Sequence, residues 1–113
     1  MDMVSPFKVA GQAFAILGST TPPSGTLLNL FGDFTIHVFN RSTTQDAYLA
    51  YGASSSIVSS AQIPVLGAPP ASQNVLPIPH ATIQTFTFSG PTYFGGLTAA
   101  GNVILDITPG LGT

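Results

Sequence analysis

Charge is the scarcest property of this sequence. Charged residues make up 5% of its 113 residues, whereas about a quarter is usual in a soluble domain. The cations are Lys8 and Arg41, and the anions are Asp2, Asp33, Asp46 and Asp106. Binding to nucleic acid or to an anionic membrane surface needs a basic patch that neutralises phosphates. Two cations exclude both nucleic acid and membrane as partners.

Cysteine is absent, so the sequence predicts neither a disulfide framework nor a thiolate metal ligand. The only histidines are His37 and His80, and no carboxylates cluster with them. A metal site needs such a cluster, and a phosphate loop needs a glycine-rich turn with a lysine. We therefore expect no metal and no cofactor. There is also no run of about 20 apolar residues that could cross a membrane as a helix.

Catalytic groups are equally sparse. Nucleophilic catalysis needs a nucleophile, a base and a group that orients the base. Asp33 and His37 share one face of a predicted strand, but four residues of strand separate their Cα atoms by about 13 Å. Asp106 lies within an apolar strand and is interpreted as an outward-facing or hydrogen-bonded carboxylate. We expect that the protein is not an enzyme.

Helices are disfavoured by the 10 prolines and 12 glycines spread along the chain. The short runs between them are rich in Phe, Val, Ile, Thr and Tyr, which favour strands. Their spacing, one strand about every dozen residues, is typical of an all-β sandwich or barrel. Eight antiparallel strands are predicted, at roughly 7–17, 26–31, 34–40, 46–52, 57–66, 75–79, 82–89 and 102–108.

The alternation within these strands also predicts which side chains share a face. Phe34, Ile36 and Val38 form one face of their strand, and residues 103, 105 and 107 form one face of the last strand. The polar stretch "NRSTTQD" (40–46) is interpreted as a hairpin loop, and Gly95-Gly96 as a bulge or bend. The whole chain is expected to be one domain, 1–113, with a short N-terminal arm (1–6) and a C-terminal tail (109–113).

What remains is an interaction protein, because a weakly charged surface does little to keep copies apart. We therefore expect self-association to a dimer or higher oligomer. Pro77 and Pro79 predict an edge strand, since proline lacks the N–H that a sheet requires. Aromatic residues near strand ends could serve equally as contact surface or as core. The candidate interface residues are Arg41, Tyr48, Tyr51, Pro77, Pro79, Tyr93 and Phe94.

One stretch resembles a known family. The sequence "HVFNRSTTQDAYLAYGASS" begins at His37 and combines an apolar strand ending in Asn, a polar turn and Ala-Tyr-Leu-Ala-Tyr-Gly. With the strand rhythm, length and low charge, the chain resembles jelly-roll capsid cement (decoration) proteins of tailed bacteriophages, of the Bordetella phage type. The motif covers residues 37–56, and the architecture covers most of the chain.

The resemblance implies an eight-stranded, antiparallel, jelly-roll-like sandwich with a structural role. Such a protein would bind the major capsid protein on the outside of the virion and stabilise contacts between capsid subunits. The resemblance transfers no individual site residues. The alternative is a receptor- or carbohydrate-binding β-sandwich, as in a phage tail fibre, and a small hydrolase is a more distant third interpretation.

Overall fold

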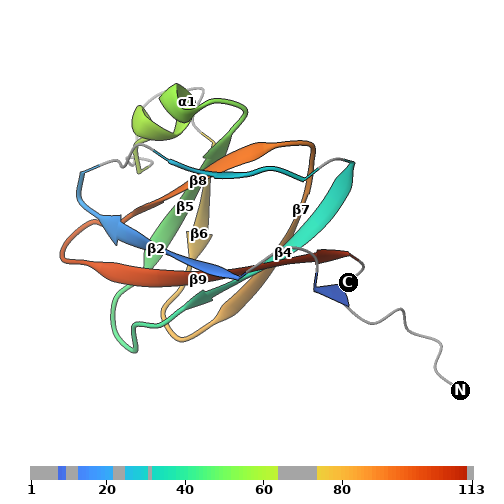
Figure 1. The fold of residues 1–113 in the computed structure, drawn as a ribbon. Helices are drawn as coiled ribbons and strands as arrows, with labels where there is room; N and C mark the ends of the chain where they lie inside the picture. Colours follow the sequence, from blue (N-terminus) through green and yellow to red (C-terminus); the bar gives the residue numbers. More distant parts are fainter. Residues whose placement is uncertain (1–7, 10–12, 22–24, 31, 64–73, 112–113) are drawn as a thin grey trace, which may run out of the picture.

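A computed structural model of the protein describes residues 8–9, 13–21, 25–30, 32–63 and 74–111. These residues form nine strands and one short helix, and Figure 1 shows how they are arranged. The elements are β1 (Lys8–Val9), β2 (Phe14–Ser19), β3 (Thr26–Leu28), β4 (Asp33–Asn40), β5 (Ala47–Gly52), α1 (Ser55–Ser59), β6 (Val75–Ile78), β7 (Ile83–Ser89), β8 (Thr92–Leu97) and β9 (Val103–Leu111).

All nine strands belong to one sheet, which confirms the all-β prediction. Its order is β6-β5-β8-β2-β9-β4-β7, with β1 added to β9 and β3 added to β8. The sheet curls on itself into a nearly closed barrel, with α1 at one end (Figure 1). The two strands at the ends of this order, β6 and β7, follow each other in sequence but share no register.

The inner face of the curled sheet holds the main hydrophobic core. Phe34, Ile36 and Val38 of β4 are at most 2% exposed, as the alternation predicted. Val103, Leu105 and Ile107 of β9 are buried in the same cluster, so the predicted faces of both strands are confirmed. These two strands pair along six residues.

The prediction of a wholly antiparallel sheet is wrong at one pair of strands. β2 and β8 run parallel, with Gly18 opposite Gly96 and Ser19 opposite Leu97. A parallel pair needs a long connection between its strands, and here most of the chain lies between them. The pairing results from the way the sheet curls, which no local sequence pattern records.

The predicted strand at 57–66 is also wrong over its described part. Residues 55–59 form α1 instead, and residues 60–63 belong to no strand. Ile57 and Val58 are β-branched and favour a strand locally. Tertiary packing overrides this preference, because Ile57 fills the space beside Gly52 and Val58 is fully buried.

Two further predictions fail near the C-terminus. The Gly95-Gly96 pair is not a bulge between strands, because both glycines lie within β8, a buried strand in the middle of the sheet that the sequence did not predict. The expected tail begins inside β9, which continues through a buried Pro109 to Leu111.

The N-terminal part also differs from the prediction. The predicted strand at 7–17 is replaced by β1 and β2, and the arm at 1–6 lies outside the described residues.

The predicted edge strand at Pro77 is confirmed, whereas the predicted hairpin around residues 40–46 is wrong. β6 lies at one end of the strand order, with Pro77 opposite Tyr48 of its only described neighbour, β5. The loop 41–46 connects β4 to β5, and these strands do not pair with each other. Each pairs with two other strands, so the loop crosses from one half of the sheet to the other.

The close approach of β2 and β8 predicts a strict requirement for glycine at position 96. An ideal Cβ there would lie 2.7 Å from the Cα atom and 2.9 Å from the backbone nitrogen of Gly18. Backbone cannot yield as a flexible side chain can. We expect Gly96→Ala to lower the free energy of unfolding by about 1–3 kcal/mol or more, as in an overpacked core. Urea denaturation measures this.

The control is Ala99→Ser, in the exposed turn that follows β8. We expect this variant to remain within about 0.5 kcal/mol of the wild type. A fully stable Gly96→Ala protein would contradict the parallel contact between β2 and β8.

Candidate interaction surface

An exposed apolar surface covers the outward face of β2, β9, β4 and β7. Leu17 is 53% exposed, Phe39 37%, Ile83 63% and Ile104 39%. Leu17 lies opposite Ile104, and Phe39 lies opposite Ile83, so each pair points to the same side of the sheet. We call these four residues the outer apolar patch. A group of exposed apolar residues on one face is a candidate interaction site in a soluble protein.

An ion pair lies within this patch. The Arg41 guanidinium binds the Asp106 carboxylate through two hydrogen bonds, both of 2.7 Å. Asp106 lies opposite Phe39, and the Arg41 backbone N–H donates to the carbonyl of Ile104. The hydrogen bond and the charge of Asp106 raise the pKa of Arg41 above its ordinary value. The two charges therefore neutralise each other, and the patch has no net charge.

The remainder of the same face is rich in hydroxyl groups. Thr35 of β4 and Thr87 of β7 share a hydrogen bond of 3.2 Å between their hydroxyl oxygens. His37 lies opposite Thr85 on one side and Thr108 on the other. This part of the outer face therefore carries neutral hydrogen-bonding groups beside the outer apolar patch. A partner could make apolar contacts with the patch and hydrogen bonds with the neighbouring hydroxyl groups.

The opposite outer face, over β5 and β8, is already covered. Val58 and Ala61, from α1 and the residues after it, pack with Ala50 of β5 and Leu97 of β8 in a second hydrophobic cluster. All four are at most 2% exposed. The fold thus shields one apolar outer face with its own helix and leaves the outer apolar patch exposed.

The loop between β4 and β5 is organised by one buried amide. The side chain of Asn40 is fully buried and donates hydrogen bonds of 3.0 Å to the carbonyls of Gln45 and Ile78. Its side-chain oxygen accepts a hydrogen bond from the backbone N–H of Ser42. The amide therefore connects the loop to edge strand β6 and holds Arg41 at the margin of the outer face.

A contact between Asp46 and His80 connects this loop to the turn after β6. Asp46 Oδ1 lies 2.7 Å from Nδ1 of His80 and accepts the backbone N–H of His80 at 3.0 Å. The backbone hydrogen bond from His80, followed by the side-chain one, holds the pKa of Asp46 below its ordinary value. Both residues are exposed, so this pair orders the loop without forming an enclosed site.

The seven residues proposed from sequence do not form one surface. Arg41 lies in the outer face, as described above. Tyr48, Pro77 and Tyr93 lie on the other outer face, around the α1 cluster and the β6 edge. Their separation follows from the curl of the sheet, which places β5 and β8 far from β4 in the strand order.

Tyr51 and Phe94 pack toward the interior, which is the core role that the sequence left open for them beside the interface role. Phe94 is fully buried, and Tyr51 packs against the inner core. Phe88 of β7 lies between them, with ring centroids 5.1 Å from Tyr51 and 5.2 Å from Phe94, both edge-to-face. Their role is to close the barrel. Pro79 is exposed in the turn between β6 and β7.

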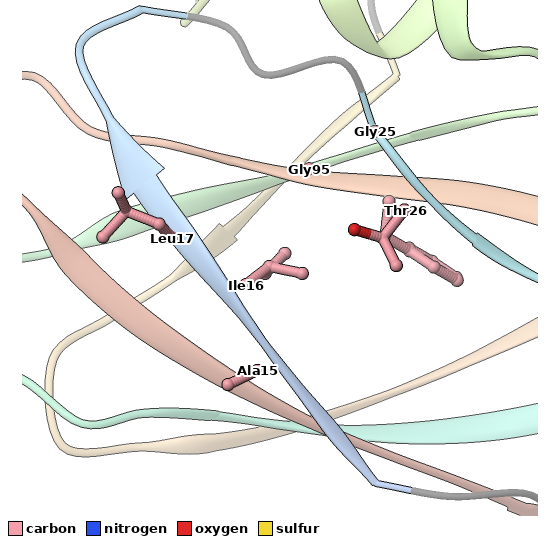
Figure 2. A pocket seen from close by; sticks show the side chains of 7 residues that line it. Ala15, Ile16, Leu17, Gly25, Thr26 and Gly95 are labelled. Carbon is pink, nitrogen blue, oxygen red and sulfur yellow. The ribbon is translucent and has the colours of Figure 1, made fainter.

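A small pocket adjoins the patch at Leu17. It lies between β2, β3 and β8 and has a volume of about 220 Å³. Figure 2 shows Ile16 and Thr26 on the strands that border it. Its lining includes no titratable side chain, so this pocket offers no acid, base or metal ligand.

The described part of the chain contains no cluster of metal-binding side chains. Residues 8–9, 13–21, 25–30, 32–63 and 74–111 contain no group of three His, Cys, Asp or Glu side chains that could hold a metal ion. Asp106, the carboxylate weighed as a catalytic group, is paired with Arg41. No helix within these ranges is long and apolar enough to cross a membrane.

Comparison with protein-family models, curated proteins and solved structures gave no match. The candidate site therefore rests on the geometry of this chain.

The four apolar residues of the patch were not proposed from the sequence, although a signal for two of them was present. Ile104 alternates with the buried residues of β9, and Phe39 alternates with those of β4. What the sequence could not show is that these two strands are neighbours.

The buried amide predicts a large effect of a small substitution. Asn40→Ala removes the donor for two carbonyls and the acceptor for one N–H. We expect the free energy of unfolding to fall by about 1–3 kcal/mol, the range for buried polar groups that lose their partners. Chemical denaturation measures this, with the exposed Asn102→Ala as the matched control. Equal stability of the two variants would contradict the role of Asn40.

The lowered pKa of Asp46 predicts a pH-dependent contribution to stability. Because folding lowers this pKa, the contribution is complete above the ordinary carboxyl range and is lost as the pH falls through the folded value. Asp46→Asn should lower the Tm at pH 7, and the difference from wild type should shrink below about pH 4. Thermal denaturation across pH measures it. His80→Ala keeps the backbone donor and should retain part of the effect. A difference independent of pH would contradict the assignment.

Proposed function

We propose that this protein is a non-enzymatic structural protein that binds the outside of a viral capsid shell and stabilises contacts between major capsid subunits. The observation that carries the proposal is the outer apolar patch, which remains exposed on one face while α1 covers the other. The resemblance of residues 37–56 to phage cement proteins supplies the class of partner. The proposed location is the capsid surface of the virion.

The physical basis of attachment would be apolar burial. The patch is neutral because Arg41 and Asp106 are paired within it. Burial contributes roughly 25 cal/mol per Å² before the costs of ordering. The threonines beside the patch would supply hydrogen bonds that set the register on the shell. Long-range charge attraction has little part in such a complex, because the chain carries six charged side chains in total.

A jelly-roll-like relationship to the cement proteins is part of the same proposal. An all-β sheet with strands packed around one core is common to many architectures, so the strand content alone does not distinguish them. The shell-binding role depends on the exposed face and not on the name of the fold.

The test uses capsid shells that lack their decoration protein, from the virus whose genome encodes this chain. Ile104→Lys places a charge in the patch, and Leu27→Lys does the same at an exposed leucine on β3, outside it. We expect Ile104→Lys to weaken binding at least tenfold and Leu27→Lys to leave it unchanged. Occupancy is measured by sedimentation with the shells.

A salt series separates apolar from ionic attachment. We expect the wild-type occupancy to change little between low and moderate salt, because screening acts on exposed charges, and to fall in urea. A steep loss with salt would show that charge holds the complex. Absence of binding to the shells, together with hits on a glycan array, would instead favour the carbohydrate-binding alternative.

A further inference from the structure

The two edges of the sheet differ in a way that bears on self-association. β6 is a short edge strand that contains Pro77 and is followed by Pro79. A proline removes a backbone donor, so this edge is a poor template for another strand. Natural proteins protect sheet edges by such means. This finding argues against strand addition at the edge marked by proline.

The other edge, β7, has no such protection. It runs for seven residues, Ile83–Ser89, without proline or a charged residue. Its residues alternate between exposed and half-buried, and none is fully buried. Every other described strand of six or more residues contains at least one buried residue. β7 pairs with β4, and no other described strand pairs with its second edge. An uncharged, unprotected edge of this length is a template for strand pairing.

We propose that the second edge of β7 pairs with β7 of a second copy of this chain, antiparallel and around a two-fold axis. A symmetric contact requires a surface that is complementary to itself. Pairing centred on Phe86 would place Thr85 opposite the partner's Thr87, and Ile83 opposite the partner's Ser89. Threonine pairs across antiparallel strands are favourable, and no like charges oppose each other.

The surrounding charges fit the same geometry. The nearest acidic residue, Asp33, lies opposite Ser89 at one end of β7. The two-fold axis would place the partner's Asp33 at the other end of the junction, six residue steps along the strand or about 20 Å away. The half-buried Phe86 and Phe88 would gain cover from the partner strand. A second copy is therefore electrostatically compatible with this edge, and it would cover apolar side chains that are now half-buried.

This pairing has a consequence for shell binding, which rests on the proposed function. Ile83 and Phe39 of the outer apolar patch lie on β7 and its neighbour β4. Joining two β7 strands would bring the patches of both copies onto one continuous sheet face. Two linked contacts bind more tightly than one because the second becomes intramolecular. The dimer would thus act as the bivalent form of the protein.

The test compares Thr85→Lys/Thr87→Lys with a matched control, Thr43→Lys/Thr44→Lys. Both change exposed threonines and add the same charge, but the control residues lie in the loop before β5. We expect the wild type and the control to sediment as dimers at micromolar concentrations. In the β7 variant, lysines would oppose lysines across the axis, and the dissociation constant should rise at least tenfold.

A cross-link tests the register directly, because the natural chain has no cysteine. A mixture of Thr85→Cys and Thr87→Cys proteins should form mixed disulfide dimers faster than either protein alone. A wild type that is monomeric at high concentration would overturn the proposal. So would a dimer that persists in the β7 lysine variant, because another surface would then form it.

Shell binding distinguishes this proposal from the proposed function. The β7 lysine variant should still bind the shells, but more weakly, because it binds as a monomer. Ile104→Lys should remain dimeric and lose shell binding. A dimer through β7 without shell binding would therefore refute the function and leave the pairing intact.

Discussion

The contact between the backbones of β2 and β8 is the constraint on which this fold depends. It joins β6, β5 and β8 to β2, β9, β4 and β7 in one sheet through only two opposed residue pairs. Gly18 and Gly96 permit the approach, and the carbonyl of Ser19 continues it by accepting the N–H of Thr98. Without this junction the two halves would be separate sheets with unsatisfied edges.

Once the halves are joined, the curl of the sheet decides what is inside. Phe88 extends from β7 to Tyr51 and Phe94 and closes the side where β6 and β7 do not pair. The buried amide of Asn40 connects the same region through the carbonyl of Ile78. Aromatic contacts and one polar network thus replace the missing ladder, and no described strand pairs with the second edge of β7.

The outer surface is asymmetric as a result. α1 covers the apolar face of β5 and β8, while the face over β9 and β4 keeps exposed apolar side chains around a neutralised ion pair. When an apolar face with internally paired charges is buried against another surface, each charge keeps its partner. The large desolvation cost of an unpaired buried charge is therefore avoided. The scarcity of charge noted in the sequence therefore has a structural counterpart: Arg41, Asp46 and Asp106 serve contacts within the chain.

The sequence by itself determined the all-β class, the inward faces of β4 and β9, and the edge position of Pro77, because alternation and the missing N–H of proline act locally. It also predicted that Asp106 is outward-facing or hydrogen-bonded. Only the tertiary structure decided that Gly95 and Gly96 lie in a central strand, that Ile57 and Val58 form a helical turn, and that Phe39 is next to Ile83. These features depend on which strands meet across the barrel. Such contacts join residues far apart in the chain, and a local pattern carries no information about its distant partner.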